Sequence, residues 1–198
     1  DAGTQRCEGV RLATCADGDG DGCVEWNAPV QCAQGAACSE GVCMALPMND
    51  AQFNEIYYDA PGADSLTVFI ELSGPPGLSL DGVRIIGVNG ANGQTYGEIE
   101  LMGEMPADGL LVIAHPDAGP ALLAVADVLD PQADLQNGPD NVILVRGAVF
   151  IDNLGYGDFS NGGEFVGQGD PAGEAGNGQS LQRVSQTNNN RNDYTTGA

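Results

Sequence analysis

The sequence contains no lysine and only one histidine, His115, among its 198 residues. The absence of lysine excludes Schiff-base catalysis, lysine isopeptide crosslinks and a phosphate-binding loop of the GxxxxGK[ST] type. The only other cations are six arginines, against 28 acidic residues, so the formal net charge is −22. A nucleic-acid binder needs a basic surface that replaces phosphate counterions, and an anionic membrane attracts the same kind of surface. We therefore expect neither as a partner.

The sequence also offers little for catalysis. A serine or cysteine hydrolase needs a general base beside its nucleophile, and the one histidine ends the apolar run "LLVIAH". A surface position at the end of a strand is the simpler interpretation of His115. The many acids allow a glycosidase pair without specifying one. We expect a protein that is not an enzyme.

No apolar run approaches the length that spans a membrane, so membrane insertion is not expected.

All six cysteines lie in the first 43 residues: Cys7, Cys15, Cys23, Cys32, Cys38 and Cys43. That segment has too few apolar residues for a core of its own, which favours three disulfides. Their connectivity stays open, because six cysteines allow fifteen pairings. Zinc is the alternative, although the segment has no CxxC pair and no histidine.

Disulfides predict an oxidising compartment. The chain begins at Asp1 without a methionine or an apolar leader, as a mature product does after signal-peptide removal. We expect a secreted, extracellular or cell-surface protein.

The motif "CADGDGDGC" places a carboxylate at every second position. Asp17, Asp19 and Asp21 match positions 1, 3 and 5 of a calcium loop, and Glu25 falls at position 9. Position 12, where such a loop has a bidentate glutamate, is occupied by Ala28. Two interpretations follow: an acidic surface turn that is crosslinked at both ends, and an incomplete calcium site. Calcium is the one cofactor that the sequence suggests.

From Phe53 onward, short apolar runs alternate with turn residues. The runs have four to eight residues rich in Val, Ile, Leu, Tyr and Phe, and the breaks contain Gly, Pro, Asn or Asp. Among the runs that predict strands are "FNEIYY", "LTVFIEL", "QTYGEIEL", "LLVIAH" and "NVILVRG". About eight such runs without intervening amphipathic helices favour two packed antiparallel sheets, with a barrel as the alternative. We predict an all-β protein with a cysteine-rich module over residues 1–45, a linker over 46–50 and an immunoglobulin-like β-sandwich over 51–198.

Three stretches of the second domain are less regular. Residues 121–129 allow one or two helical turns. Residues 155–179 are glycine-rich and acidic and predict a long surface loop, in which Phe159 and Phe165 pack on the sandwich or on a partner. After a strand at 180–184, the chain becomes an asparagine-rich loop, which predicts side-chain hydrogen bonds to nearby backbone that cover a sheet edge. These asparagines are Asn188, Asn189, Asn190 and Asn192.

The second domain resembles the lamin-tail domains of bacterial proteins over nearly all of residues 51–198. The ordered blocks that carry this resemblance are "FNEIYYDAPGAD", "VFIEL", "LSLDGVRIIGVNGANGQTYGEIEL", "PADGLLVIAH", "LQNGPDNVILV", "IDNLGYG" and "SLQRVSQTNNNRNDYTTG". The last block contains the terminal pattern of Arg183, Asn189, Asn192, Asp193 and Tyr194. The insertion around residues 157–179 and the ending "TTGA" depart from the family pattern. The resemblance implies an immunoglobulin-like sandwich on an exported protein, without catalytic residues of its own.

Several residues allow both a structural and a functional interpretation. Trp26 and the pair Tyr57 and Tyr58 are candidates for a carbohydrate-stacking platform, although packing explains them more simply. Glu71 interrupts an apolar strand. Alternation places it on the solvent face, whereas the resemblance implies a buried hydrogen-bonding role.

Two functional hypotheses remain. The first is a non-catalytic extracellular structural protein that self-associates into a filament, sheath or surface layer through exposed sheet edges or the glycine-rich loop. The second is a soluble secreted binding module for glycan, peptide or calcium, with aromatics and acidic residues lining a recess.

Overall fold

The computed structural model describes residues 2–8, 11–17, 25–32, 36–45, 49–62 and 67–197. Strands account for 43% of the structure and helices for 5%, so the all-β prediction is confirmed. Within the described residues, no helix is long and apolar enough to cross a membrane.

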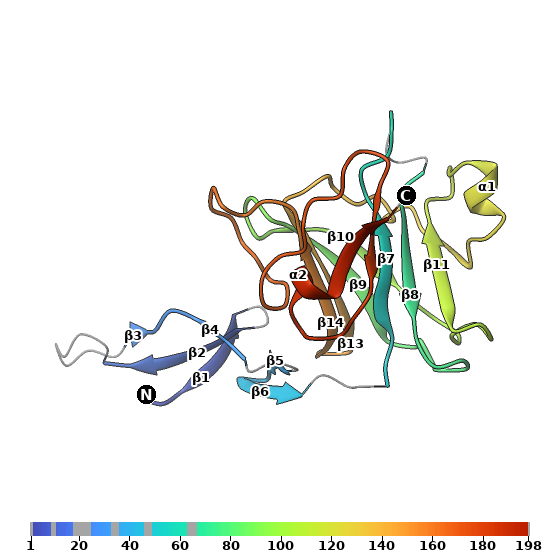
Figure 1. The fold of residues 1–198 in the computed structure, drawn as a ribbon. Coiled ribbons are helices and arrows are strands. Elements are labelled where there is room, and N and C mark those ends of the chain that lie inside the picture. The colour runs from blue at the N-terminus through green and yellow to red at the C-terminus, as the bar shows by residue number, and fades with distance from the viewer. Residues whose placement is uncertain are drawn as a thin grey trace.

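The cysteine module consists of short antiparallel strands, seen at the left and bottom of Figure 1. Its four-stranded sheet contains β1 (Gln5–Glu8), β2 (Arg11–Ala16), β3 (Glu25–Trp26) and β4 (Val30–Gln31). A separate hairpin contains β5 (Ala36–Ser39) and β6 (Val42–Ala45).

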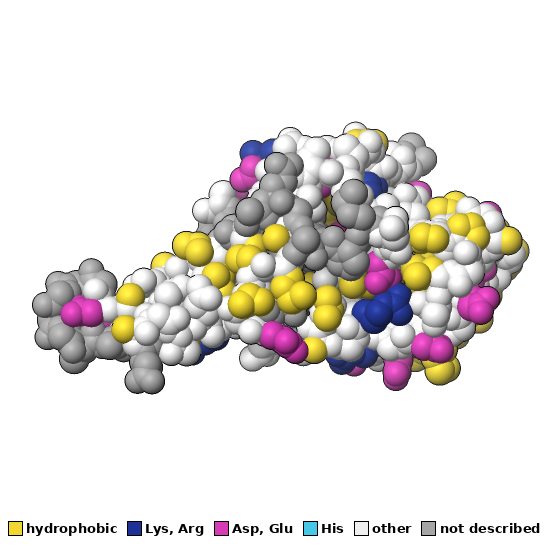
Figure 2. All heavy atoms as spheres, turned by 90° about the horizontal axis from the view of Figure 1, so that it is seen from below, with side chains coloured by type: hydrophobic (Ala, Val, Ile, Leu, Met, Phe, Trp, Pro, Cys, Tyr) yellow, Lys and Arg dark blue, Asp and Glu magenta, His cyan; other side chains and the backbone are white. Residues whose placement is uncertain are grey.

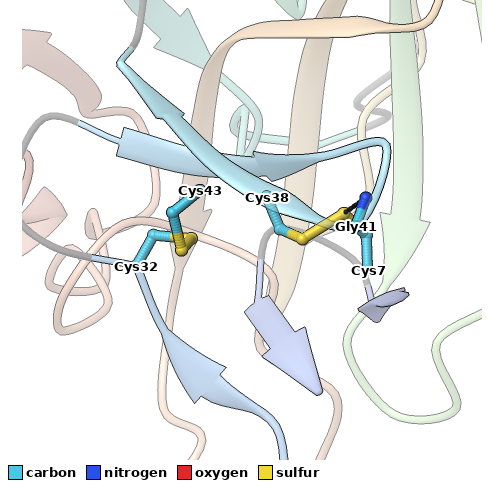
Figure 3. Close-up of a disulfide and its surroundings, with 5 residues drawn as sticks. All are labelled: Cys7, Cys32, Cys38, Gly41 and Cys43. Carbon is cyan, nitrogen blue, oxygen red and sulfur yellow. Dashed lines mark hydrogen bonds between the residues drawn. A yellow bond between two sulfur atoms is a disulfide. The ribbon is translucent and has the colours of Figure 1, made fainter. Parts of the chain in front are cut away.

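Two disulfides connect this sheet to the hairpin (Figure 3). Cys7 of β1 is bonded to Cys38 of β5, and Cys32, just after β4, is bonded to Cys43 of β6. The turn between β5 and β6 requires Gly41, because a Cβ there would lie 2.8 Å from the backbone oxygen of Gln5. Two of the three expected disulfides are therefore present, and they indicate an oxidising environment.

The remaining two cysteines lie close together in the sequence, but only one is described. Cys15 of β2 is buried and is bonded to none of the described cysteines. Cys23 lies outside the described residues. The third predicted disulfide stays a prediction.

The second domain contains two sheets. One has four strands in the order β10-β9-β13-β14, and the other has six in the order β12-β11-β8-β7-β15-β16. The strands are β7 (Gln52–Tyr57), β8 (Phe69–Ser73), β9 (Val83–Asn89), β10 (Thr95–Glu100), β11 (Leu110–Ala114), β12 (Val128–Leu129), β13 (Asp140–Arg146), β14 (Val149–Tyr156), β15 (Ser180–Arg183) and β16 (Tyr194–Gly197). Two single-turn helices, α1 (Pro120–Leu123) and α2 (Asn190–Asp193), lie in the connections.

One apolar core joins the two sheets. Ile56 and Ile70 of the six-stranded sheet and Ile85 and Leu144 of the four-stranded sheet belong to the same buried cluster. Alternation along the strands explains this arrangement, because every second side chain of β8 and of most of β9 points inward. The two sheets therefore pack face to face, as the alternating apolar runs predicted.

The four-stranded sheet also carries apolar residues on its outer face. All but the last residue of β13 are buried, so this strand is covered on both sides. Val88, Ile143 and Val145 form a second apolar cluster there, separate from the main core. The cysteine module lies on this side, since β5 contacts β14. Figure 2 shows hydrophobic side chains along the junction of module and sandwich.

The end of the predicted linker is held by an ion pair. The guanidinium of Arg146 donates to both carboxylate oxygens of Asp50, at 2.6 and 3.1 Å. Burial alone raises the pKa of Asp50, but the hydrogen bonds from Arg146 and from the Ala51 backbone outweigh it and hold the pKa below its usual value. A bidentate pair of this kind fixes where the chain enters the sandwich.

Most predicted strands of the second domain lie within one to three residues of the observed ones. The helical turn expected within residues 121–129 is α1, followed by the two-residue strand β12. The expectation for the C-terminus was incomplete, because the asparagine-rich segment forms α2 and then β16, the edge strand of the six-stranded sheet.

Candidate functional site

The glycine-rich segment forms the walls of a surface cleft of about 630 Å³, which we call the loop cleft. Its walls are residues 157–160 and 171–174, and Arg191 of α2 lines a further side. A short parallel bridge between Tyr156 and Ala172 holds the two walls together, with the Ala172 amide donating to Gly155 at 2.8 Å. The volume is within the range of small-molecule sites in proteins.

A buried asparagine, Asn190, anchors the glycine-rich segment to the sandwich. Its side-chain oxygen accepts hydrogen bonds from the backbone amides of Gly155 and Gln168, both at 2.9 Å. Its side-chain amide donates to the Asn153 carbonyl at 3.0 Å. Asn190 is fully buried, so these three bonds replace the strand partner that the outer edge of β14 lacks. The asparagine-rich segment thus covers a sheet edge, as predicted.

Two asparagines of the four-stranded sheet hold the middle of the same segment. Asn141 donates to the Glu164 carbonyl at 2.9 Å and accepts from the Val166 amide at 3.0 Å. Asn153 donates to the Val166 carbonyl at 2.7 Å. An amide side chain can donate and accept at once, so it can stand in for a neighbouring strand. The glycine-rich segment is therefore fixed to the sandwich and is not a free loop.

A buried ion pair closes the sandwich beneath this region. The Arg183 guanidinium donates to the Asp152 carboxylate at 2.6 Å and to the Phe53 carbonyl at 2.7 Å. Its Nη2 also donates to the hydroxyl of Tyr194, at 2.6 Å. Burial alone lowers the pKa of Arg183, but the Asp152 carboxylate more than offsets this effect. The pKa is therefore raised overall, and the guanidinium stays charged. The pair connects β14 of one sheet to β7, β15 and β16 of the other.

Asp193 organises the turn that precedes α2. Its carboxylate is fully buried and accepts hydrogen bonds from the Ser185 hydroxyl at 3.0 Å, the Thr187 amide at 2.5 Å and the Asn189 amide at 3.1 Å. Asn189 caps α2 by accepting from the Arg191 amide at 3.1 Å. These contacts place the backbone of Arg191 beside the loop cleft.

The side chains of the loop cleft combine charge of both signs with one aromatic ring. Asp158 and Glu174 are exposed on opposite walls, and a hydrogen bond from Ser160 lowers the pKa of Asp158. Phe159 packs edge-on against Phe165, with ring centroids 5.3 Å apart, which holds the Phe159 ring in place. The arrangement provides acceptors, a cationic donor and a partly exposed ring in one recess.

The predicted calcium residues are only partly described. Asp17 ends the described part of its segment, and Glu25 is exposed in β3, whereas Asp19 and Asp21 lie outside the described residues. Among the residues that are described, no three His, Cys, Asp or Glu side chains gather as a metal site would need. The calcium site stays a prediction.

The candidate aromatic residues have different surroundings. Tyr58 is fully buried and stacks on Tyr156 at 4.3 Å between ring centroids, so it belongs to the core. Tyr57 packs on Phe69 at 5.8 Å. Trp26 is 38% exposed, and the guanidinium of Arg6 lies 4.1 Å from its ring centroid. The packing interpretation holds for Tyr58, and the three rings do not form one platform.

Two further residues that the sequence singled out make local contacts. The Nδ1 atom of His115 accepts a hydrogen bond from the Asp117 backbone at 3.1 Å, in the turn after β11. The carboxylate of Glu71 is half-buried and accepts from the side chain of Asn54 at 2.5 Å. Glu71 therefore combines the two interpretations, since it lies away from the core and still has a hydrogen-bond partner.

Sequence reasoning missed the loop cleft. The sequence predicted that Phe159 and Phe165 make packing contacts, but it gave no sign that Arg191 lies next to the glycine-rich segment. Comparison with protein-family models, curated proteins and solved structures finds no match for this chain.

Proposed function

We propose that this protein is a non-catalytic, exported binding protein that holds a saccharide in the loop cleft. The observation that carries the proposal is a preformed cleft of about 630 Å³, whose walls adjoin backbone that buried asparagine side chains hold at Gly155, Glu164 and Gln168. A fixed loop loses little conformational entropy when a ligand binds, which favours affinity.

The chemistry of the lining favours a sugar over an ion. Asp158 and Glu174 supply hydrogen-bond acceptors for hydroxyl groups, and Arg191 supplies donors. Two carboxylates against one guanidinium disfavour an anionic ligand. The partly exposed ring of Phe159 offers an apolar face for the C–H side of a sugar ring.

Export is part of the proposal. The two disulfides support an oxidising compartment, and a net charge of −22 favours solubility over contact with anionic surfaces. We further propose that the two packed sheets are an immunoglobulin-like sandwich of the lamin-tail type. The ordered sequence blocks that resemble that family support this proposal.

Self-assembly into a filament, sheath or surface layer is the second candidate, and one observation favours it. The outermost strand β16 has the uncharged sequence Tyr-Thr-Thr-Gly, and Thr195 and Thr196 are exposed. By contrast, the edge strand β10 carries the charged residues Glu98 and Glu100. Charges on an edge oppose pairing with another chain, so β16 is the better place for strand addition.

The binding function is tested with a glycan array, followed by calorimetry on any sugar that binds. Arg191→Gln should weaken binding about tenfold or more, because it removes a charge-assisted donor from the cleft. Arg84→Gln is the matched control, since Arg84 pairs with Glu98 on another part of the surface at 2.7 Å. Equal binding by both variants, or no bound glycan, would contradict the proposal.

Assembly is tested by light scattering with and without calcium. Large species that form with the unmodified protein but not with Thr196→Pro would support strand addition at β16. Proline has no backbone N–H, so it cannot donate a hydrogen bond to an added strand. A monomer under all conditions would reject this candidate.

A further inference from the structure

A second cleft, which we call the module groove, lies between the cysteine module and the outer face of the four-stranded sheet. Its volume is about 430 Å³, and its lining comes from both parts of the chain. Glu8 and Arg11 belong to the module, whereas Val88, Asn92, Ile143 and Glu164 belong to the sandwich. Ligand sites occur preferentially at such junctions between domains.

The floor of the module groove is apolar. Val88 and Ile143 are 6% and 7% exposed, and they belong to the cluster on the outer face of the sheet. One wall is fixed at the backbone of Glu164, whose amide donates to the Gly90 carbonyl at 2.7 Å and whose carbonyl accepts from the Asn141 side chain at 2.9 Å. Only a small part of each of these side chains is open to the groove, so the floor offers a firm but narrow apolar patch to an aliphatic side chain.

Arg11 distinguishes the module groove from an ordinary apolar crevice. Four of the six arginines pair with a carboxylate: Arg6 with Glu8, Arg84 with Glu98, Arg146 with Asp50 and Arg183 with Asp152. Arg11 is half-buried in the groove lining, and its guanidinium pairs with no carboxylate of the described residues. In a protein with net charge −22, such a guanidinium favours a carboxylate from outside the chain.

The neighbouring acids limit the charge of that ligand. Glu8 is already paired with Arg6, whereas Glu164 is exposed and has no ion pair with a described residue. One guanidinium beside one uncompensated carboxylate accommodates a single negative charge and disfavours a dianion such as phosphate. A ligand that carries one carboxylate next to an apolar group therefore matches both the guanidinium of Arg11 and the apolar floor of the groove.

We infer that the module groove binds the C-terminal residue of a peptide with an apolar side chain. The terminal carboxylate pairs with the guanidinium of Arg11, and the side chain lies on Val88 and Ile143. This site is separate from the loop cleft and does not depend on the proposed saccharide function.

The test uses N-acetyl-leucine as the smallest peptide C-terminus and N-acetylleucinamide as its uncharged counterpart. Both are titrated into the full chain while backbone amide resonances are followed by nuclear magnetic resonance. We expect N-acetyl-leucine to shift the amides of Asn92, Gly93 and Val166 and to bind about tenfold or more tightly than the amide. Arg11→Gln should abolish this difference, whereas the control Arg84→Gln should preserve it.

The inference is overturned if the acid and the amide bind equally, if the shifts lie outside the groove, or if inorganic phosphate binds more tightly than N-acetyl-leucine. The comparison of acid and amide needs only the unmodified protein, so it decides the question even if Arg11→Gln does not fold. A negative result here leaves the glycan experiment on the loop cleft unaffected.

Discussion

Replacing Asn190 with alanine tests whether one side chain holds the walls of the loop cleft. The substitution removes two hydrogen bonds of 2.9 Å from the amides of Gly155 and Gln168 and one of 3.0 Å to the Asn153 carbonyl. All four residues are buried, so water does not readily replace the lost partners. Each buried polar group left without a partner costs about 1–3 kcal/mol.

Three such groups predict a loss of about 3–5 kcal/mol in the free energy of unfolding, allowing for some relaxation. For a chain of this size, each kcal/mol lowers the melting temperature by about 2–4 °C, which corresponds to a fall of about 10 °C. The measurement is urea denaturation followed by circular dichroism, together with a thermal melt. Chymotrypsin should also cleave Asn190→Ala faster at Phe159 and Phe165, because the segment that carries them loses its anchor.

Asn192→Ala is the control for this experiment. Asn192 is exposed on the same short helix, and its side chain makes no hydrogen bond with the described residues. Its substitution should change the free energy of unfolding by less than about 0.5 kcal/mol. If Asn190→Ala were as stable as Asn192→Ala and equally resistant to protease, Asn190 would not hold the loop.

Three further predictions concern charges and thiols. Burial raises the pKa of Asp140, so the folded protein is more stable with this carboxyl group protonated, and that stability is lost as the pH rises through the folded pKa. Asp140→Asn should therefore raise the free energy of unfolding by about 1 kcal/mol at pH 7, and by less at pH 4, in urea denaturation. Arg146→Gln should cost about 1 kcal/mol at neutral pH, and the cost should vanish in acid, because the lowered pKa of Asp50 gives stability that is lost as the pH falls through it. Mass spectrometry after alkylation of the unreduced, denatured protein should find no adduct on Cys15 or Cys23, and an adduct would contradict the third disulfide.

Strand positions were the most predictable part of the fold. The run "NVILVRG" predicts a strand, and β13 occupies Asp140–Arg146. The run "LLVIAH" likewise corresponds to β11 over Leu110–Ala114. Both predictions depend on side-chain alternation and on turn residues within a window of about ten positions, which the sequence displays directly. The strand β16 was missed, because asparagines and threonines beside a turn carry too weak an alternation.

The loop cleft was less predictable because its parts are far apart in the sequence. Asn189, Asn190 and Asn192 are chemically alike, yet Asn190 is buried with three partners and Asn192 is exposed. The partners of Asn190 lie between 22 and 37 positions away, so no local pattern distinguishes it from its neighbours. The same holds for Arg191, which reaches the cleft only because Asp193 and Asn189 shape the turn before it.

By itself, the sequence determined that this is an all-β protein with a disulfide-rich segment, because both properties follow from composition and local alternation. Only the tertiary structure decided which cysteines pair, which asparagines become buried and which arginines face a cleft. Each of these outcomes depends on contacts between residues distant in the chain, where side chains of one type differ only in what surrounds them.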